Sequence, residues 1–130
     1  DTVVEGPLPP APSGGGEPSQ LLHSAIEVES GQKLLLRISN VGLDRFWTLT
    51  APGLTMQKVG TGARHMRGPT GKNVYVESAS INSGGGESMS LLIDTTGVAP
   101  GTYFLQTTEL HQMSNATQLD GGMITEIVVN

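Results

Sequence analysis

Short segments that alternate apolar and polar side chains recur along this chain, and each ends at a glycine or proline turn. Residues 26–29 alternate in this way, and residues 34–39 continue the pattern after a Ser-Gly-Gln turn. No window shows the helical period of about 3.6 residues. The pattern predicts an all-β domain, a sandwich or barrel of about seven or eight strands. The later strands are expected at residues 46–50, 54–59, 74–81, 89–94, 102–107 and 123–129.

Glycine and proline are unevenly distributed along the chain. Of its 18 Gly and 8 Pro residues, nine lie within residues 1–20. Proline removes backbone donors and glycine raises the entropic cost of ordering, so this segment is predicted to be a linker or tail. Residues 21–130 then form the folded domain. A passive linker and a Pro-rich ligand for another domain both suit this composition. A linker at this place leads us to expect another domain or a membrane anchor before it.

The absence of cysteine and the negative charge exclude several classes of protein. With Cys 0 the chain has no disulfide, thiolate nucleophile, Cys-ligated zinc or iron–sulfur cluster, and no blue-copper centre. The net charge of −5 argues against a nucleic-acid partner. No apolar run reaches the roughly 20 residues that span a bilayer, so we expect no direct membrane insertion. The lack of cysteine permits an extracytoplasmic location, the periplasm or cell surface, which we expect here.

Motifs for catalysis are missing as well. The chain has no Gly-x-Ser-x-Gly segment of a nucleophile elbow. Its Gly-rich runs lack the spacing of a phosphate loop. We therefore predict no catalytic residues and no bound cofactor, and expect that the domain itself is not an enzyme.

Histidine and methionine offer one alternative, a copper-binding or copper-transfer module. His65 precedes Met66 directly, and His111 lies two positions before Met113. Imidazole and thioether together can hold Cu(I). The two loops would have to meet at one end of the sandwich for this to happen. Otherwise these histidines are exposed loop residues, and the methionines fill gaps in the packing.

Basic residues gather in a Gly-rich segment, which we expect to be a long flexible loop at residues 60–73. Between Arg45 and Val76 there are five Lys or Arg and no Asp or Glu. Such a loop can dock on an acidic partner, or it can be an ordinary solvated loop. The candidate docking residues are Lys58, Arg64, Arg67 and Lys72.

A further alternative is an adhesive or carbohydrate-binding β-sandwich at the cell surface. It would need an exposed aromatic platform. The available aromatic residues stand within predicted strands, which favours burial. They are Phe46, Trp47, Tyr75, Tyr103 and Phe104.

Four motifs, in order and at suitable spacing, resemble the plastocyanin-like domain of multicopper oxidases. Residues 36–40 read Leu-Arg-Ile-Ser-Asn, like that family's Leu-Arg-Ile-x-Asn strand. Residues 85–94 resemble its Pro-Gly-Glu-Arg turn and following strand, and residues 100–105 its Pro-Gly-Thr-Trp/Tyr strand. Residues 121–129 resemble its Gly-Met-Met closing strand. The resemblance implies a Greek-key β-sandwich of cupredoxin type.

The departures from the family pattern concern the copper ligands. Copper-binding members carry His-x-His on the third strand, where this chain has Thr48-Leu49-Thr50, and His-Cys-His later, where it has Gln106-Thr107-Thr108. Hydroxyls and amides are poor copper ligands. The resemblance therefore implies a copper-free, non-catalytic domain that serves as a structural or docking unit. Its partner would be another protein or neighbouring domains of the same chain, and the parent protein can still be an oxidase. Trp47 and Leu49 are expected to point into the sandwich, with Trp47 as a core anchor.

Overall fold

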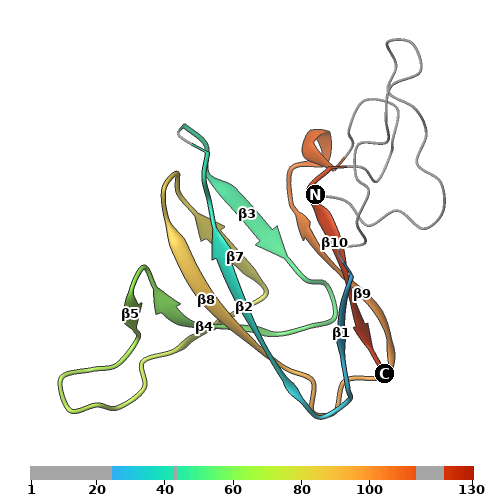
Figure 1. Ribbon diagram of the computed structural model, residues 1–130, viewed down its shortest axis with the longest axis horizontal. Coiled ribbons are helices and arrows are strands. Elements are labelled where there is room, and N and C mark those ends of the chain that lie inside the picture. Colours follow the sequence, from blue (N-terminus) through green and yellow to red (C-terminus); the bar gives the residue numbers. More distant parts are fainter. Residues whose placement is uncertain (1–24, 43, 114–121) are drawn as a thin grey trace.

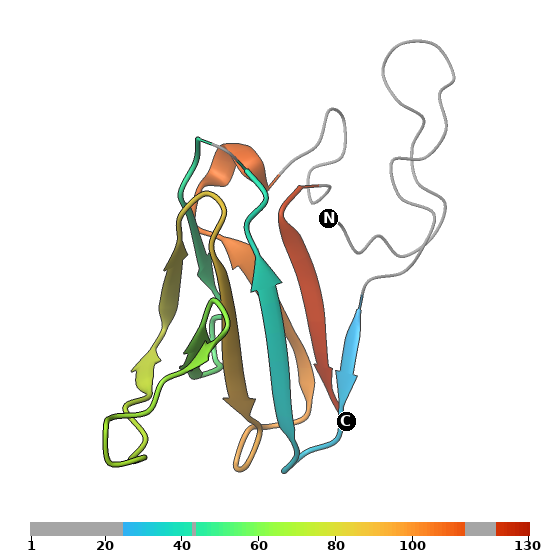
Figure 2. The ribbon, with the colours of Figure 1, turned by 60° about the vertical axis from the view of Figure 1, so that its left-hand side comes forward.

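The computed structural model describes residues 25–42, 44–113 and 122–130. These residues form two facing β-sheets (Figures 1 and 2). The elements are β1 (Ile26–Val28), β2 (Lys33–Ser39), β3 (Trp47–Thr50), β4 (Met56–Thr61), β5 (Arg64–His65), β6 (Val76–Ser78), β7 (Ser80–Ser83), β8 (Ser88–Asp94), β9 (Gly101–Thr107), the 3-10 helix η1 (Leu110–Gln112) and β10 (Ile124–Val129). The predicted all-β sandwich is confirmed.

Strands that follow one another in the sequence often belong to different sheets. The first sheet has the order β1-β10-β9-β3-β7, and the second has the order β2-β8-β4, with β5 and β6 both paired to β4. All neighbours are antiparallel except β1 and β10, which run parallel. The chain thus crosses between the sheets several times, as a Greek-key sandwich requires.

The core lies between the sheets and follows the alternation in the sequence. In β8, Met89, Leu91 and Ile93 are buried, whereas the residues between them are half-buried. From the first sheet, Ile127 and Val129 of β10 meet this layer. Burial of these side chains supplies most of the driving force for packing one sheet on the other.

The described part of the chain has ten strands, more than expected. The segment at residues 74–81 is two strands, because β6 pairs with β4 in the second sheet and β7 pairs with β3 in the first. At the crossing, the Ser78 hydroxyl donates to the Ser80 carbonyl oxygen (2.6 Å). The remaining difference is β5, which forms within the expected loop.

Asp94, at the end of β8, leads to a pH prediction. Hydrogen bonds from the Thr96 side chain and backbone N–H lower the pKa of Asp94 from its ordinary value of 3.8, and the charge of Lys33 adds to this. A lowered pKa contributes stability that is present above the unfolded-state value and is lost as the pH falls through the folded-state value. We therefore expect Asp94→Asn to lower Tm slightly near neutral pH, with a Tm difference that shrinks as the pH falls below 3.8 through the lowered pKa of Asp94. Thermal melts of both proteins across this range measure it, and a Tm difference that does not depend on pH would contradict it.

Candidate functional site

The five positions that correspond to copper ligands in the resembled family, Thr48, Thr50, Gln106, Thr107 and Thr108, come together in the first sheet. Strand β3 lies beside β9, with Thr50 opposite Gln106 and Leu49 opposite Thr107. Just beyond β9, the Thr108 backbone N–H donates to the Thr48 carbonyl oxygen (2.9 Å). We call these residues the five ligand positions.

The five ligand positions divide between two faces of the sheet. Leu49 and Thr107 are buried between the sheets, at 9% and 0% exposure. Because side chains alternate along a strand, Thr48, Thr50 and Gln106 lie on the outer face. The expected inward direction of Leu49 is thus confirmed. Trp47 is only half-buried and is not among the residues of the core or those packed against it, so the expected core anchor was wrong.

The hydroxyl groups at these positions are occupied by hydrogen bonds within the domain. The Thr48 hydroxyl donates to Asn82 Oδ1 (2.8 Å), and the Thr50 hydroxyl donates to the Ala79 carbonyl oxygen (3.0 Å). The buried Thr107 Oγ1 accepts from the Glu109 backbone N–H (3.2 Å). Neutral hydroxyls of this kind do not fit copper, which binds imidazole and thiolate. Within the described ranges there is no group of three or more His, Cys, Asp or Glu able to hold a metal ion.

The two His-Met pairs lie on different elements. His65 is exposed in β5, on the β4 edge of the second sheet, and Met66 follows it half-buried. His111 is exposed in η1, which follows β9 of the first sheet, and its Nε2 lies 3.5 Å from the Glu109 carboxylate. Strand β5 and η1 are well separated in Figures 1 and 2. The structure therefore does not bring the two pairs into one site.

The family model for multicopper oxidases matches residues 11–130. The chain belongs to the multicopper oxidase family. The match begins within residues 1–20, the predicted linker, which lies outside the described residues.

Solved structures of multicopper oxidases share the fold of this domain. The multicopper oxidase mgLAC has a TM-score of 0.70 and 15% identity, over 92% of this chain and 38% of that one. The blue copper oxidase from Nitrosomonas europaea has 0.65 and 19%, over 91% and 38%. The laccase from Botrytis aclada has 0.62 and 14%, over 80% and 18%. No curated protein matches. The chain thus has a cupredoxin-like fold and spans well under half of these proteins.

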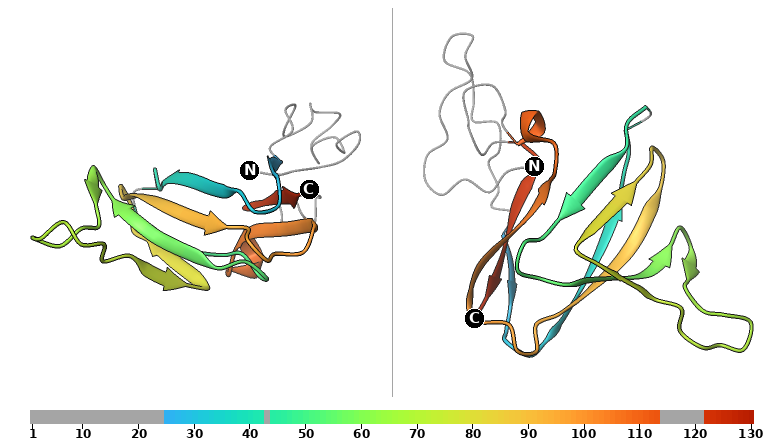
Figure 3. Two further views of the ribbon diagram at one scale, coloured as in Figure 1. Left: turned by 90° about the horizontal axis from the view of Figure 1, so that it is seen from below. Right: turned by 180° about the vertical axis from the view of Figure 1, so that it is seen from behind.

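The basic segment of this multicopper oxidase domain is not a plain loop, because β5 forms within residues 60–73 and backbone hydrogen bonds continue beyond it. The Met66 N–H donates to the Val59 carbonyl oxygen (2.8 Å), and the Gly68 N–H donates to the Lys72 carbonyl oxygen (2.8 Å). A bridge between Arg67 and Asn73 closes the tip. These backbone bonds join the two sides of the Gly-rich segment into an arm, which projects from the sandwich (Figures 1 and 3). The four candidate docking residues comprise exposed Arg64, Arg67 and Lys72 and half-buried Lys58.

Two aromatic residues that we expected to be buried are exposed. Phe46 is 73% exposed and Phe104 is 43% exposed. Phe46 precedes β3 and lies over Gly84, where an added Cβ would come within 3.1 Å of the Phe46 ring. Phe104 points outward because its neighbours Tyr103 and Leu105 pack against the core. The remaining aromatic residues, Trp47, Tyr75 and Tyr103, are half-buried.

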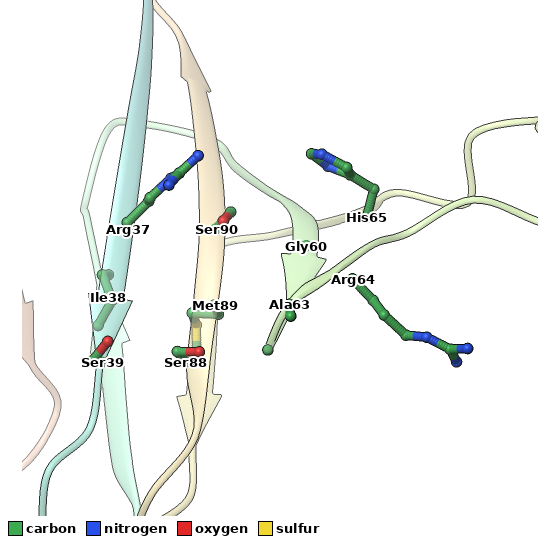
Figure 4. A pocket seen from close by; sticks show the side chains of 11 residues that line it. Arg37, Ile38, Ser39, Gly60, Ala63, Arg64, His65, Ser88, Met89 and Ser90 are labelled. Atoms are coloured by element: carbon green, nitrogen blue, oxygen red, sulfur yellow. The ribbon is translucent and has the colours of Figure 1, made fainter.

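A hollow on the outer face of the second sheet was not anticipated from the sequence. Its volume is about 300 Å³, and Arg37, Ser90 and His65 are among the residues that line it. Figure 4 shows these side chains. The alternation in β2 places Arg37 on the outer face, but only the register of four strands brings it near His65.

Proposed function

We propose that this domain is a copper-free, non-catalytic module of a larger multicopper oxidase-like protein. The observation that carries the proposal is the state of the five ligand positions. Their backbone lies on neighbouring strands, but their side chains are hydroxyls and one amide. The hydroxyls of Thr48, Thr50 and Thr107 already have hydrogen-bond partners within the domain. Loss of imidazole and thiolate at every position leaves the site without the ligands that copper prefers.

The module would act by docking against neighbouring domains of the same chain or against another protein. The outer face of the first sheet carries Thr48, Thr50 and Gln106, and Phe104 stands exposed on the same face of β9. An exposed aromatic side chain with hydroxyl and amide neighbours suits a protein interface, where aromatic anchors and short polar groups are common. The chain spans 38% of mgLAC, which leaves room for neighbouring domains in a relative of that size.

The proposed setting is outside the cytoplasm, and the partners do not include nucleic acid. The sequence has no cysteine and a net charge of −5, which are compatible with both proposals. In the part of the chain that the structure describes, no helix is long and apolar enough to cross a membrane.

A copper titration tests the proposal. We expect the purified chain to take up less than one equivalent of either Cu(I), measured against a competing chelator, or Cu(II), measured by equilibrium dialysis and elemental analysis. The variants His65→Ala and His111→Ala are expected to behave like the parent, because β5, which carries His65, and η1, which carries His111, are well separated (Figures 1 and 2). One retained equivalent that disappears in His111→Ala would instead favour a His/Met copper-transfer module and would overturn the proposal.

A further inference from the structure

The hollow on the outer face of the second sheet is built from one cross-strand row. Arg37 of β2 lies opposite Ser90 of β8, Ser90 lies opposite Gly60 of β4, and Gly60 lies opposite His65 of β5. Arg37 and His65 therefore stand at the two ends of a row whose middle positions carry a serine and a glycine. The long side chains at the ends form walls, and the short residues between them form a floor.

The two basic side chains lean toward each other across this floor. Figure 4 shows the Arg37 guanidinium and the His65 ring extending from opposite sides above Ser90 and Gly60. The Arg64 side chain points away from them in the same view, although its residue also lines the hollow. Among the side chains that Figure 4 labels around the hollow, those of Arg37 and His65 thus present nitrogen atoms to a common space.

Gly60 keeps the floor open. A Cβ added at residue 60 would come within 3.3 Å of the Ser90 Cβ, 3.4 Å of its Oγ and 3.2 Å of the Arg64 carbonyl oxygen. Gly60 is not among the glycines with positive φ, so the backbone conformation alone does not require glycine. A larger residue here would fill the space beside Ser90 and crowd it.

The charges around the hollow are not neutralised. The residues that line it include Arg37, Arg64 and His65 but no Asp or Glu. Within the described ranges, the ion pairs are Lys33 with Asp94 and His111 with Glu109, and neither involves the hollow. Serine hydroxyls at residues 39, 88 and 90 add hydrogen-bond donors to the walls and floor. The guanidinium cation of Arg37, the imidazole of His65 and hydroxyl donors, with no Asp or Glu in the lining, favour an anion.

We propose that this hollow binds the carboxylate side chain of an extended acidic segment in a partner protein. A single guanidinium matches the two oxygens of a planar carboxylate in a bidentate pair. Two residues before Arg37, on the same face of β2, the exposed Leu35 lies opposite Leu92 of β8. Residues two apart in an extended strand lie on one face about 7 Å apart. The partner segment therefore carries Asp or Glu at the hollow and an apolar residue two positions away.

This inference extends the proposed function, because it names the chemistry of a docking partner. It concerns the second sheet, whereas the five ligand positions lie in the first. The copper titration and the carboxylate titration can therefore fail independently of each other.

The test is an NMR titration of the full chain with a blocked peptide, acetyl-Ala-Leu-Gly-Glu-Ala-amide, and with its Gln counterpart. We expect the Glu peptide to shift the signals of Arg37, His65 and Ser90 saturably, and the Gln peptide to bind at least about tenfold more weakly. Arg37→Gln should weaken binding of the Glu peptide by about tenfold or more. Gly60→Val should abolish it by filling the floor. Arg45→Gln is the matched control, because it removes an exposed cationic side chain that does not line the hollow, and it should change the affinity less than about twofold.

Three outcomes would overturn the inference. The first is no localised shift with the Glu peptide in a chain whose spectrum shows that it is folded. The second is that inorganic phosphate binds through the same residues more tightly than acetate, which serves as the simplest carboxylate probe. This result would reassign the hollow to a phosphate. The third is a dependence of the Arg37 and His65 signals on protein concentration without any peptide, which would mean that a second copy of the chain occupies the hollow.

Discussion

Asn40→Ala is expected to destabilise the domain by about 2–4 kcal/mol, because one buried amide joins three parts of the fold. Asn40 is 7% exposed. Its Nδ2 donates to the carbonyl oxygens of Arg45 (3.0 Å) and Ser83 (3.1 Å), and its Oδ1 accepts from the Gly42 N–H (2.9 Å). Alanine removes all three bonds and leaves the Ser83 carbonyl oxygen without this partner. Urea denaturation followed by circular dichroism measures the loss.

Asn73→Ala provides the matched control for this prediction. Asn73 is exposed near the tip of the arm, and its bridge to Arg67 uses the backbone, which alanine retains. We expect a change within about 0.5 kcal/mol, as for ordinary surface substitutions. If Asn40→Ala loses no more stability than Asn73→Ala, the hydrogen bonds of Asn40 do not support the fold in the way described.

The role of Asn40 shows what the sequence can and cannot predict about this fold. The strand that precedes Asn40 is evident from local alternation, and the Leu-Arg-Ile-x-Asn pattern that ends at Asn40 is part of the family resemblance. The partners of the side chain are not local, since Ser83 lies 43 residues away. The alternation of apolar and polar residues and the turn residues therefore predict the sandwich. The side-chain hydrogen bonds that stabilise its loops depend on residues far apart in the sequence, so local patterns do not predict them.

The same physical limit divides the candidate sites. The five ligand positions could be located because the family motifs place them on two strands, and the observed pairing of β3 with β9 brings them together. The hollow at Arg37 and His65 depends on the register of four strands, including a shift in β4 between Lys58 and Gly60. A shift of one residue moves a side chain to the opposite face, so alternation in a single strand cannot predict such a row.

Restoring two imidazoles to the first sheet should restore metal binding. In the double variant Thr50→His with Gln106→His, the new side chains occupy positions that lie directly opposite each other on β3 and β9. Cross-strand neighbours have Cβ atoms about 4.5–5.5 Å apart, close enough for both rings to hold one ion. Since the second imidazole then binds intramolecularly, we expect an affinity for Cu(II) about 100-fold higher than with Thr50→His alone. Isothermal titration with Cu(II) measures both variants.

The matched control is Thr50→His combined with Thr102→His. Residue 102 lies on the same strand as Gln106 but four positions away, a separation of about 13 Å along β9. This variant has the same number of imidazoles as the first, yet the two cannot share an ion, so its Cu(II) affinity should match that of Thr50→His alone. Equal affinities for the two double variants would mean that β3 and β9 do not place residues 50 and 106 close enough for two imidazoles to bind one copper ion. A gain confined to the Thr50→His, Gln106→His variant would show that the backbone of the site persists and that the identity of the side chains alone keeps copper out.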